Sequence, residues 1–268
     1  MPDTPKPGVP DLGTVAFSTL AEALRRGLAD LKRAPGFALI FAGVYIVGGW
    51  LMGLITWATG QTYWLVFAAI GFPLIAPFAA VGFYDVSRRI EQGRPLDWMQ
   101  VFSVVLRQSK RQLPSISAVI IVIFLFWFFL AHMIFALFLG LSTMTNVSSS
   151  FEVYLSANGL MMLAVGTAVG AGFAVVLYMI TVLSLPLLLD REIDFVTAMI
   201  TSFQYVQNNV VVMFSWAAFI AIVTFVSMLP GFLGLLISLP VLGHATWHLY
   251  DMLAYGTEAA PQGRELRA

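Results

Sequence analysis

The chain has no cysteine at all, and charged side chains are scarce. Without cysteine, a disulfide framework, a thiolate metal site and a cysteine nucleophile are all excluded. Asp, Glu, Lys and Arg make up 10% of the 268 residues, whereas about 25% is usual for a soluble domain. Hydrophobic residues make up 59%. This composition predicts a protein whose main solvent is the lipid bilayer.

Both ends of the chain are polar. Residues 1–13 are proline-rich and lack the apolar core of a signal peptide, so we expect a disordered tail that is not cleaved. Residues 257–268 are predicted to be a cytoplasmic tail. Residues 14–256 between them are predicted to form one membrane domain.

Apolar stretches long enough to cross a bilayer core, which takes about 20 helical residues, recur along this domain. We identify six, which predicts an all-α membrane protein with six transmembrane helices. The fourth stretch is overlong, so we expect it to tilt, kink or lie partly outside the membrane. The six ranges are 37–58, 63–84, 115–140, 159–189, 210–229 and 231–253.

The cations lie on one side of these predicted spans. Of the 14 Lys and Arg residues, five precede the first span, six lie between the second and third spans, Arg191 follows the fourth, and two are in the C-terminal tail. The three other connections contain none. Under the positive-inside rule both termini are predicted to be cytoplasmic.

An amphipathic stretch precedes each pair of spans, with apolar residues at the i, i+3, i+4, i+7 spacing of a helix. The first two carry cations on the opposite face, which predicts helices lying at the interface with their cations toward anionic headgroups. The third has no cation in its body, so it could pack against protein instead. The residues predicted to contact headgroups or the interface are Arg25, Arg26, Lys32, Arg33, Trp98, Arg107, Lys110 and Arg111.

These elements suggest three tandem units, about 14–93, 94–191 and 192–256, each an interfacial helix followed by a two-helix hairpin. The second and third amphipathic stretches both begin with an N-cap aspartate directly before an aromatic residue. The alternative is that any hairpin membrane protein has linkers with a polar face. The second span of each unit contains proline and ends at an aspartate; these residues are Pro73, Pro77, Pro186 and Pro240, and Asp85, Asp190 and Asp251.

The three terminal aspartates need an explanation, because a negative charge at a helix C-terminus is unfavourable by about 0.3–1 kcal/mol. Asp85 has two arginines one turn later, and Asp190 adjoins Arg191, but Asp251 has no local cation. We hypothesise that each aspartate ties its span to an interfacial helix, with Asp251 meeting a basic residue of another unit. A solvated helix end without a special role is the alternative.

His244 and His248 lie one helical turn apart in PVLGHATWHLYDML and could supply two ligands to a haem or metal. His132, the third histidine of the chain, is predicted at another depth. We therefore favour a structural role for His244 and an interfacial one for His248, with haem or metal binding as the alternative. No cofactor is predicted.

The stretch PFAAVGFYDVSRRIEQGRPLDWMQVF, residues 77–102, is similar to the corresponding segment of a bacterial integral membrane family known as domain of unknown function 2189. The resemblance covers the chain from about Leu20 to Tyr255. It implies a six-span bacterial membrane protein, with the inner membrane as the predicted location, and supplies no catalytic residues.

Nothing in the sequence predicts catalysis, because it contains no serine-hydrolase elbow, no phosphate loop, and no Asp, Glu, Lys or Arg near a midplane. We expect a non-enzymatic accessory subunit of a membrane complex or a lipid-binding membrane organiser. Its expected partners are lipids and other membrane subunits, and no nucleic acid is expected. The alternative is a passive transporter or channel for a neutral or apolar solute, since proline-broken helices and repeats mark transporter sites. Its cavity would be lined by residues such as Thr167, Thr181, Ser184, Ser227 and Ser238.

Overall fold

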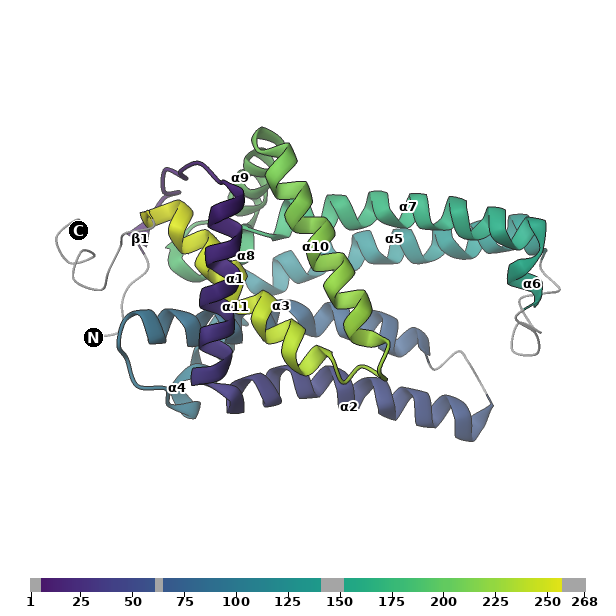
Figure 1. Cartoon of the computed structure of the whole chain (residues 1–268), viewed down its shortest axis with the longest axis horizontal. Helices are drawn as coiled ribbons and strands as arrows, with labels where there is room; N and C mark the ends of the chain where they lie inside the picture. Colours follow the sequence, from purple (N-terminus) through teal and green to yellow (C-terminus); the bar gives the residue numbers. More distant parts are fainter. Residues whose placement is uncertain (1–5, 61–64, 141–151, 257–268) are drawn as a thin grey trace.

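The computed structural model describes residues 6–60, 65–140 and 152–256, and this part of the chain is helical apart from one short strand pair (Figure 1). The predicted all-α class is confirmed. The elements are β1 (Lys6–Pro7), α1 (Phe17–Arg33), α2 (Pro35–Thr59), α3 (Leu65–Glu91), α4 (Trp98–Gln108), α5 (Leu113–Leu139), α6 (Glu152–Leu155), α7 (Ala157–Thr181), α8 (Ser184–Asp190), β2 (Arg191–Glu192), α9 (Phe195–Asn208), α10 (Val210–Met228) and α11 (Leu235–Tyr255).

Four segments within the described residues are long and apolar enough to cross a membrane: α2, α5, α10, and α7 together with α8. They match the first, third, fifth and fourth predicted spans. The predicted count of six spans is not confirmed, because α3 and α11 are not among these four. Residues 63 and 64 of the second predicted span lie outside the described residues.

The overlong fourth span is broken between α7 and α8. Pro186 has no backbone N–H, and its ring conflicts with the carbonyl four residues earlier, so an α-helix cannot continue undisturbed through it. Ser202 of α9 satisfies the backbone at the break: its hydroxyl accepts a hydrogen bond from the Leu183 N–H (3.1 Å) and donates one to the Met179 carbonyl (2.7 Å). The expected kink is thus a helix break stabilised by the next amphipathic helix.

The three amphipathic stretches form α1, α4 and α9, at the positions that their spacing predicts. Asp97 caps α4 by accepting from the Gln100 N–H (2.9 Å), and Asp194 caps α9 by accepting from the Thr197 N–H (2.9 Å). Both predicted caps are confirmed. The residues of the predicted apolar stripe of α9 pack on the protein core, as its lack of cations allowed; they are Phe195, Ala198, Met199, Phe203 and Val206.

Helices α3 and α11 are central to the assembly. Helix α11 packs against α1, α2, α3, α8 and α10, and α3 packs against α2, α4, α5, α8 and α11. In Figure 1 the α2–α3 and α5–α7 hairpins extend away from the end where α1 lies across α11. Because the last part of α11 is covered by other helices rather than by lipid, it can hold polar side chains that face protein.

The described part of the segment before α1, residues 6–16, contacts remote parts of the chain. β1 pairs in parallel with β2, joining Lys6 to Arg191 and Pro7 to Glu192. The Gly13 N–H donates to the Leu253 carbonyl at 2.8 Å. Lys6, Pro7 and Gly13, which belong to the predicted disordered tail 1–13, thus pair through their backbone with remote segments, and disorder of this tail stays a prediction. Residues 1–5 and 257–268 lie outside the described part.

Candidate functional site

Three buried helix ends meet at one end of the molecule and form its candidate site. The segments are residues 81–87 of α3, 182–189 around α8, and 244–253 of α11, and every residue in them is buried. Helices α3, α8 and α11 also contact one another pairwise. Each segment contains or adjoins one of the predicted aspartates, so polar groups gather where the three ends meet.

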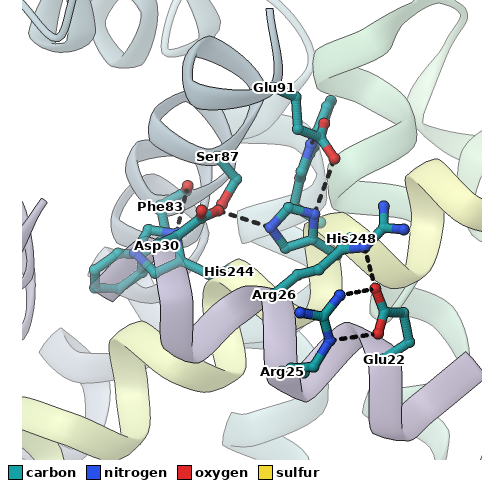
Figure 2. Close-up of polar contacts among 10 residues, drawn as sticks. Glu22, Arg25, Arg26, Asp30, Phe83, Ser87, Glu91, His244 and His248 are labelled. Atoms are coloured by element: carbon teal, nitrogen blue, oxygen red, sulfur yellow. Dashed lines mark hydrogen bonds and ion pairs between the residues drawn. The ribbon is translucent and has the colours of Figure 1, made fainter. Parts of the chain in front are cut away.

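His248 bridges two carboxylates from two other helices (Figure 2). Its Nε2 lies 2.7 Å from Oδ2 of Asp30 in α1, and its Nδ1 lies 2.9 Å from Oε1 of Glu91 at the end of α3. A carboxylate only accepts hydrogen bonds, so both contacts are satisfied when the imidazole carries a proton on each nitrogen. The Trp247 indole N–H donates to the other oxygen of Glu91 at 3.0 Å. Asp30 and His248 are both 2% exposed, so this charge pair is shielded from water.

His244 lies one turn earlier and is fully buried. Its Nδ1 is 3.1 Å from the Phe83 carbonyl oxygen and 2.8 Å from the Ser87 hydroxyl. Because the carbonyl can only accept, this nitrogen carries the proton. Within the described part of the chain, its Nε2 has no hydrogen-bond partner. His244 therefore joins α11 to α3 through one nitrogen and keeps a lone pair on the other.

These positions decide between the roles predicted for the histidines. The structural role of His244 is supported by its contacts with α3. The interfacial role of His248 is wrong, because α1 and α3 cover the ring. Both nitrogens of His248 already face carboxylates, and the described residues contain no group of three or more His, Asp or Glu placed to hold a metal ion. His132 lies apart on α5, where its Nδ1 contacts the Phe128 carbonyl.

Asp85 is buried at the end of the second predicted span and pairs with Arg89, whose Nε donates to it at 2.7 Å. The same guanidinium donates to Oε1 of Gln100 in α4 at 2.7 Å. Asp85 thus fixes an arginine that links α3 to α4, which we predict to be an interfacial helix. This geometry supports the tie that we hypothesised for this aspartate.

Asp190 forms a second polar connection, between α8 and α11. It accepts hydrogen bonds from the hydroxyls of Tyr250 (2.8 Å) and Tyr255 (2.5 Å), and Arg191 lies 3.3 Å from it. The Arg191 guanidinium also donates to the Tyr255 hydroxyl at 3.0 Å. The partner of Asp190 is therefore the last helix, whereas we hypothesised a tie to an interfacial helix.

Asp251 is 2% exposed, which contradicts the alternative of a solvated helix end. The basic partner from another unit stays a prediction. Of the prolines, Pro73 and Pro77 lie within α3, Pro186 within α8 and Pro240 within α11.

Helix α1 presents two different apolar faces. Leu20, Ala23 and Gly27 are buried, and a Cβ on Gly27 would lie only 2.7 Å from a backbone oxygen of α11. Phe17 and Leu28 on another face are exposed, at 58% and 43%. One face of α1 therefore packs on the protein, while the other is free to contact lipid.

The cations of α1 differ in their surroundings. Arg25 and Arg26 both pair with Glu22, at 2.6 and 2.7 Å, and the Arg25 side chain is 73% exposed. Hydrogen bonds from these two guanidinium groups lower the pKa of Glu22 to about 2. Lys32 and Arg33 are exposed at the end of the helix. The predicted headgroup contacts of α1 remain predictions.

Helix α4 and the turn that follows it carry the other predicted headgroup residues. Trp98 stacks on Phe37 of α2 with ring centroids 3.8 Å apart, so the tryptophan that we predicted at the interface is fixed to the start of the first span. Met99 and Leu106 are 80% and 64% exposed. The remaining predicted residues of this segment are Arg107 and Lys110, which are exposed, and Arg111, which is partly buried.

Sequence reasoning missed Asp30, Ser87 and Glu91. The burial of Asp30 could have been predicted, because Asp30 lies on the same face of α1 as Ala23 and Gly27, where the side chains are small. A lone carboxylate on a close-packing face implies a buried partner. Glu91 had no comparable signal, since it ends a helix beside two arginines.

Residues 65–190 match the family model described as predicted integral membrane protein (DUF2189). The matched segment extends from the start of α3 to the end of α8. It is shorter than the range, about Leu20 to Tyr255, that the resemblance predicted. No curated protein and no solved structure matches the chain. Over residues 65–190 the chain therefore matches, as residues 77–102 indicated, the DUF2189 family of predicted integral membrane proteins.

Proposed function

We propose that this integral membrane protein is non-enzymatic and organises anionic lipid or a larger membrane complex from the cytoplasmic side of a bacterial inner membrane. The observation that carries the proposal is the exposed surface of α4. Met99 and Leu106 expose most of their apolar side chains, and Arg107 and Lys110 are exposed beside them. Apolar side chains suit the acyl boundary and cations suit anionic headgroups, so such a helix favours the interface of an anionic membrane.

The proposed topology has six spans, with α3 and α11 as the additional two. Both helices are long enough for a bilayer core of roughly 30 Å at 1.5 Å per residue. The polar part of α11 would lie at the cytoplasmic end, among α1, α3 and α8. The connections between α2 and α3, α5 and α7, and α10 and α11 contain no Lys or Arg, which supports cytoplasmic termini.

The three-unit repeat is supported by where burial is concentrated. In each proposed unit, the last segment of the second span is buried, and the three segments contact one another. Tyr84-Asp85 and Tyr250-Asp251 occupy equivalent places in the first and third units. Three similar hairpins would thus bury equivalent ends against each other and leave their first spans to face lipid.

A passive carrier for a neutral or apolar solute is the second candidate. It is favoured by the helix break near Pro186 and by the buried Ser238 hydroxyl, which has no hydrogen-bond partner within the described residues. Against it, Thr181 and Ser184 donate to the Leu177 and Ile180 carbonyls one turn earlier in their own chain. Hydroxyls engaged in this way contribute less to a polar pathway.

The topology is testable because any cysteine introduced into this chain is unique. Single cysteines at Thr59, Pro230 and Arg94 would be treated with a membrane-impermeant maleimide in intact and permeabilised cells. We expect labelling from outside at Thr59 and Pro230, and labelling only after permeabilisation at Arg94. Labelling of Pro230 from the inside, or at neither surface, would refute the third hairpin as a pair of spans.

The lipid role is tested by native mass spectrometry of the purified chain in nanodiscs containing phosphatidylglycerol and phosphatidylethanolamine. We expect wild type to retain the anionic lipid preferentially and R107Q/K110Q to lose at least about half of that preference, because each cation near the surface contributes about 1 kcal/mol. The matched control is R264Q/R267Q, which removes the same charge from the C-terminal tail. Equal retention of phosphatidylglycerol in all three proteins would contradict the proposal.

A further inference from the structure

We propose that the Asp30–His248–Glu91 bridge is a proton-dependent clamp that holds the N-terminal helix α1 and the end of α3 onto the last helix. The three side chains come from three helices, and Asp30 and His248 are 218 positions apart in the chain. The bridge therefore joins the beginning and the end of the membrane domain.

The clamp depends on one proton. With both ring nitrogens protonated, His248 donates to Asp30 at 2.7 Å and to Glu91 at 2.9 Å, and the three groups together carry one negative charge. A neutral imidazole has one N–H, so the other nitrogen would present its lone pair to a carboxylate. The bridge would then carry two negative charges and lack one of its hydrogen bonds, in a place shielded from water.

The charged and titratable groups around His248 come from three helices. Asp30 faces it from α1, Glu91 faces it from α3, and His244 and the buried Asp251 lie one turn away on α11. Arg26 of α1 lies one turn before Asp30, and its Nε is bonded to Glu22 at 2.7 Å (Figure 2). The Trp247 N–H already donates to Glu91. Loss of the proton is thus expected to remove one of the two hydrogen bonds by which His248 holds α1 and α3.

The helices at the clamp are packed closely, so loss of the His248 bridge is expected to change the position of α1 measurably. Gly27, one turn before Asp30, brings the backbone of α1 against α11. Ala34 lies between the end of α1 and the start of α2. The N-terminal end of α1 is held separately, since Gly13 is bonded to Leu253 and to the Tyr205 hydroxyl. Opening would therefore swing the C-terminal half of α1, which carries the exposed Leu28.

The test measures a distance across the clamp in the full chain. Spin labels would be attached to L28C in α1 and M99C in α4, which are both exposed positions. The distance between them would be measured by pulsed electron paramagnetic resonance in nanodiscs from about pH 6 to about pH 10, a range that begins near the ordinary pKa of histidine. We expect one narrow distance near neutral pH and a second population, displaced by roughly 5 Å, that grows as the pH rises. That displacement is about one turn of a helix.

Three variants identify the group responsible. H248Q, which cannot carry the proton, should show the displaced population at every pH. D30N removes one carboxylate that stabilises the imidazolium, so its transition should move to lower pH. H132Q, a matched change on α5, should keep the wild-type profile. If H248Q fails to fold, the titration of the protein with native His248 still tests the proposal. A distance between the two labels that stays the same over the whole pH range overturns it. So does an H248Q sample that retains the wild-type distance and its pH profile.

Discussion

Replacing Gly27 by alanine should weaken the docking of α1 on α11, although alanine is the better helix former. A Cβ at this position would lie 2.7 Å from the Val241 carbonyl oxygen and 2.8 Å from the Ala245 nitrogen. Ordinary van der Waals contact begins near 3.4 Å, so the two backbones must separate by about 0.7 Å. Both contacted atoms belong to the backbone, so the strain cannot be relieved by rotating a side chain.

Two opposing effects set the size of this change. Overpacking of a close contact costs about 1–3 kcal/mol, whereas replacing glycine by alanine inside a helix gains up to about 1 kcal/mol. The separation also strains the contact between Asp30 and His248, one turn away along α1. We expect a net loss of about 1–2 kcal/mol in the free energy of unfolding, and an apparent Tm lower by a few degrees for a chain of this size.

The assay is thermal unfolding in one detergent, followed by tryptophan fluorescence, together with hydrogen exchange of the α1 amides. The matched control is G43A in α2, where nothing lies within 4 Å of the added Cβ. That variant should melt at or above the wild-type temperature. If G27A also melts at or above the wild-type temperature, and the exchange of α1 is unchanged, then the backbone approach of α1 to α11 does not exist as described.

Two further predictions concern helix ends. S202A should leave the buried Leu183 N–H without its partner, which costs about 1–3 kcal/mol, and should lower the apparent Tm, whereas S202T should be milder because the hydroxyl is kept. D194A should speed hydrogen exchange at Thr197, since it removes the cap of α9. Hydrogen bonds from Thr197 lower the pKa of Asp194 in the folded chain. The stability that the cap contributes is therefore present above the pKa that Asp194 has in the unfolded chain, and it is lost as the pH falls through the pKa that Asp194 has in the folded chain. An exchange rate at Thr197 that is the same in D194A and wild type would show that this cap is dispensable.

The sequence was informative wherever a local rule decides the structure. Helices α4 and α9 begin where an aspartate precedes an aromatic residue, because a side-chain carboxylate satisfies backbone N–H groups that the first turn leaves free. The break in the fourth span follows in the same way from the missing N–H of Pro186. Neither inference needs any knowledge of what lies next to the helix.

The bridge at His248 could not be predicted in this way, because it depends on which helices become neighbours. Local hydropathy does not distinguish between two locations for a histidine near the end of a span, the membrane interface and the interior of a helix bundle. The location of His248 depends on α1. This helix has the charge pattern of a surface helix, but on a second face Ala23 and Gly27 let it approach the backbone of another helix. The small residues of that face, rather than the cations beside it, indicated the close contact. Where small residues bring a helix close to another helix, a carboxylate in the same row must find its counter-charge on the partner helix. The histidine that we assigned to the interface was that counter-charge.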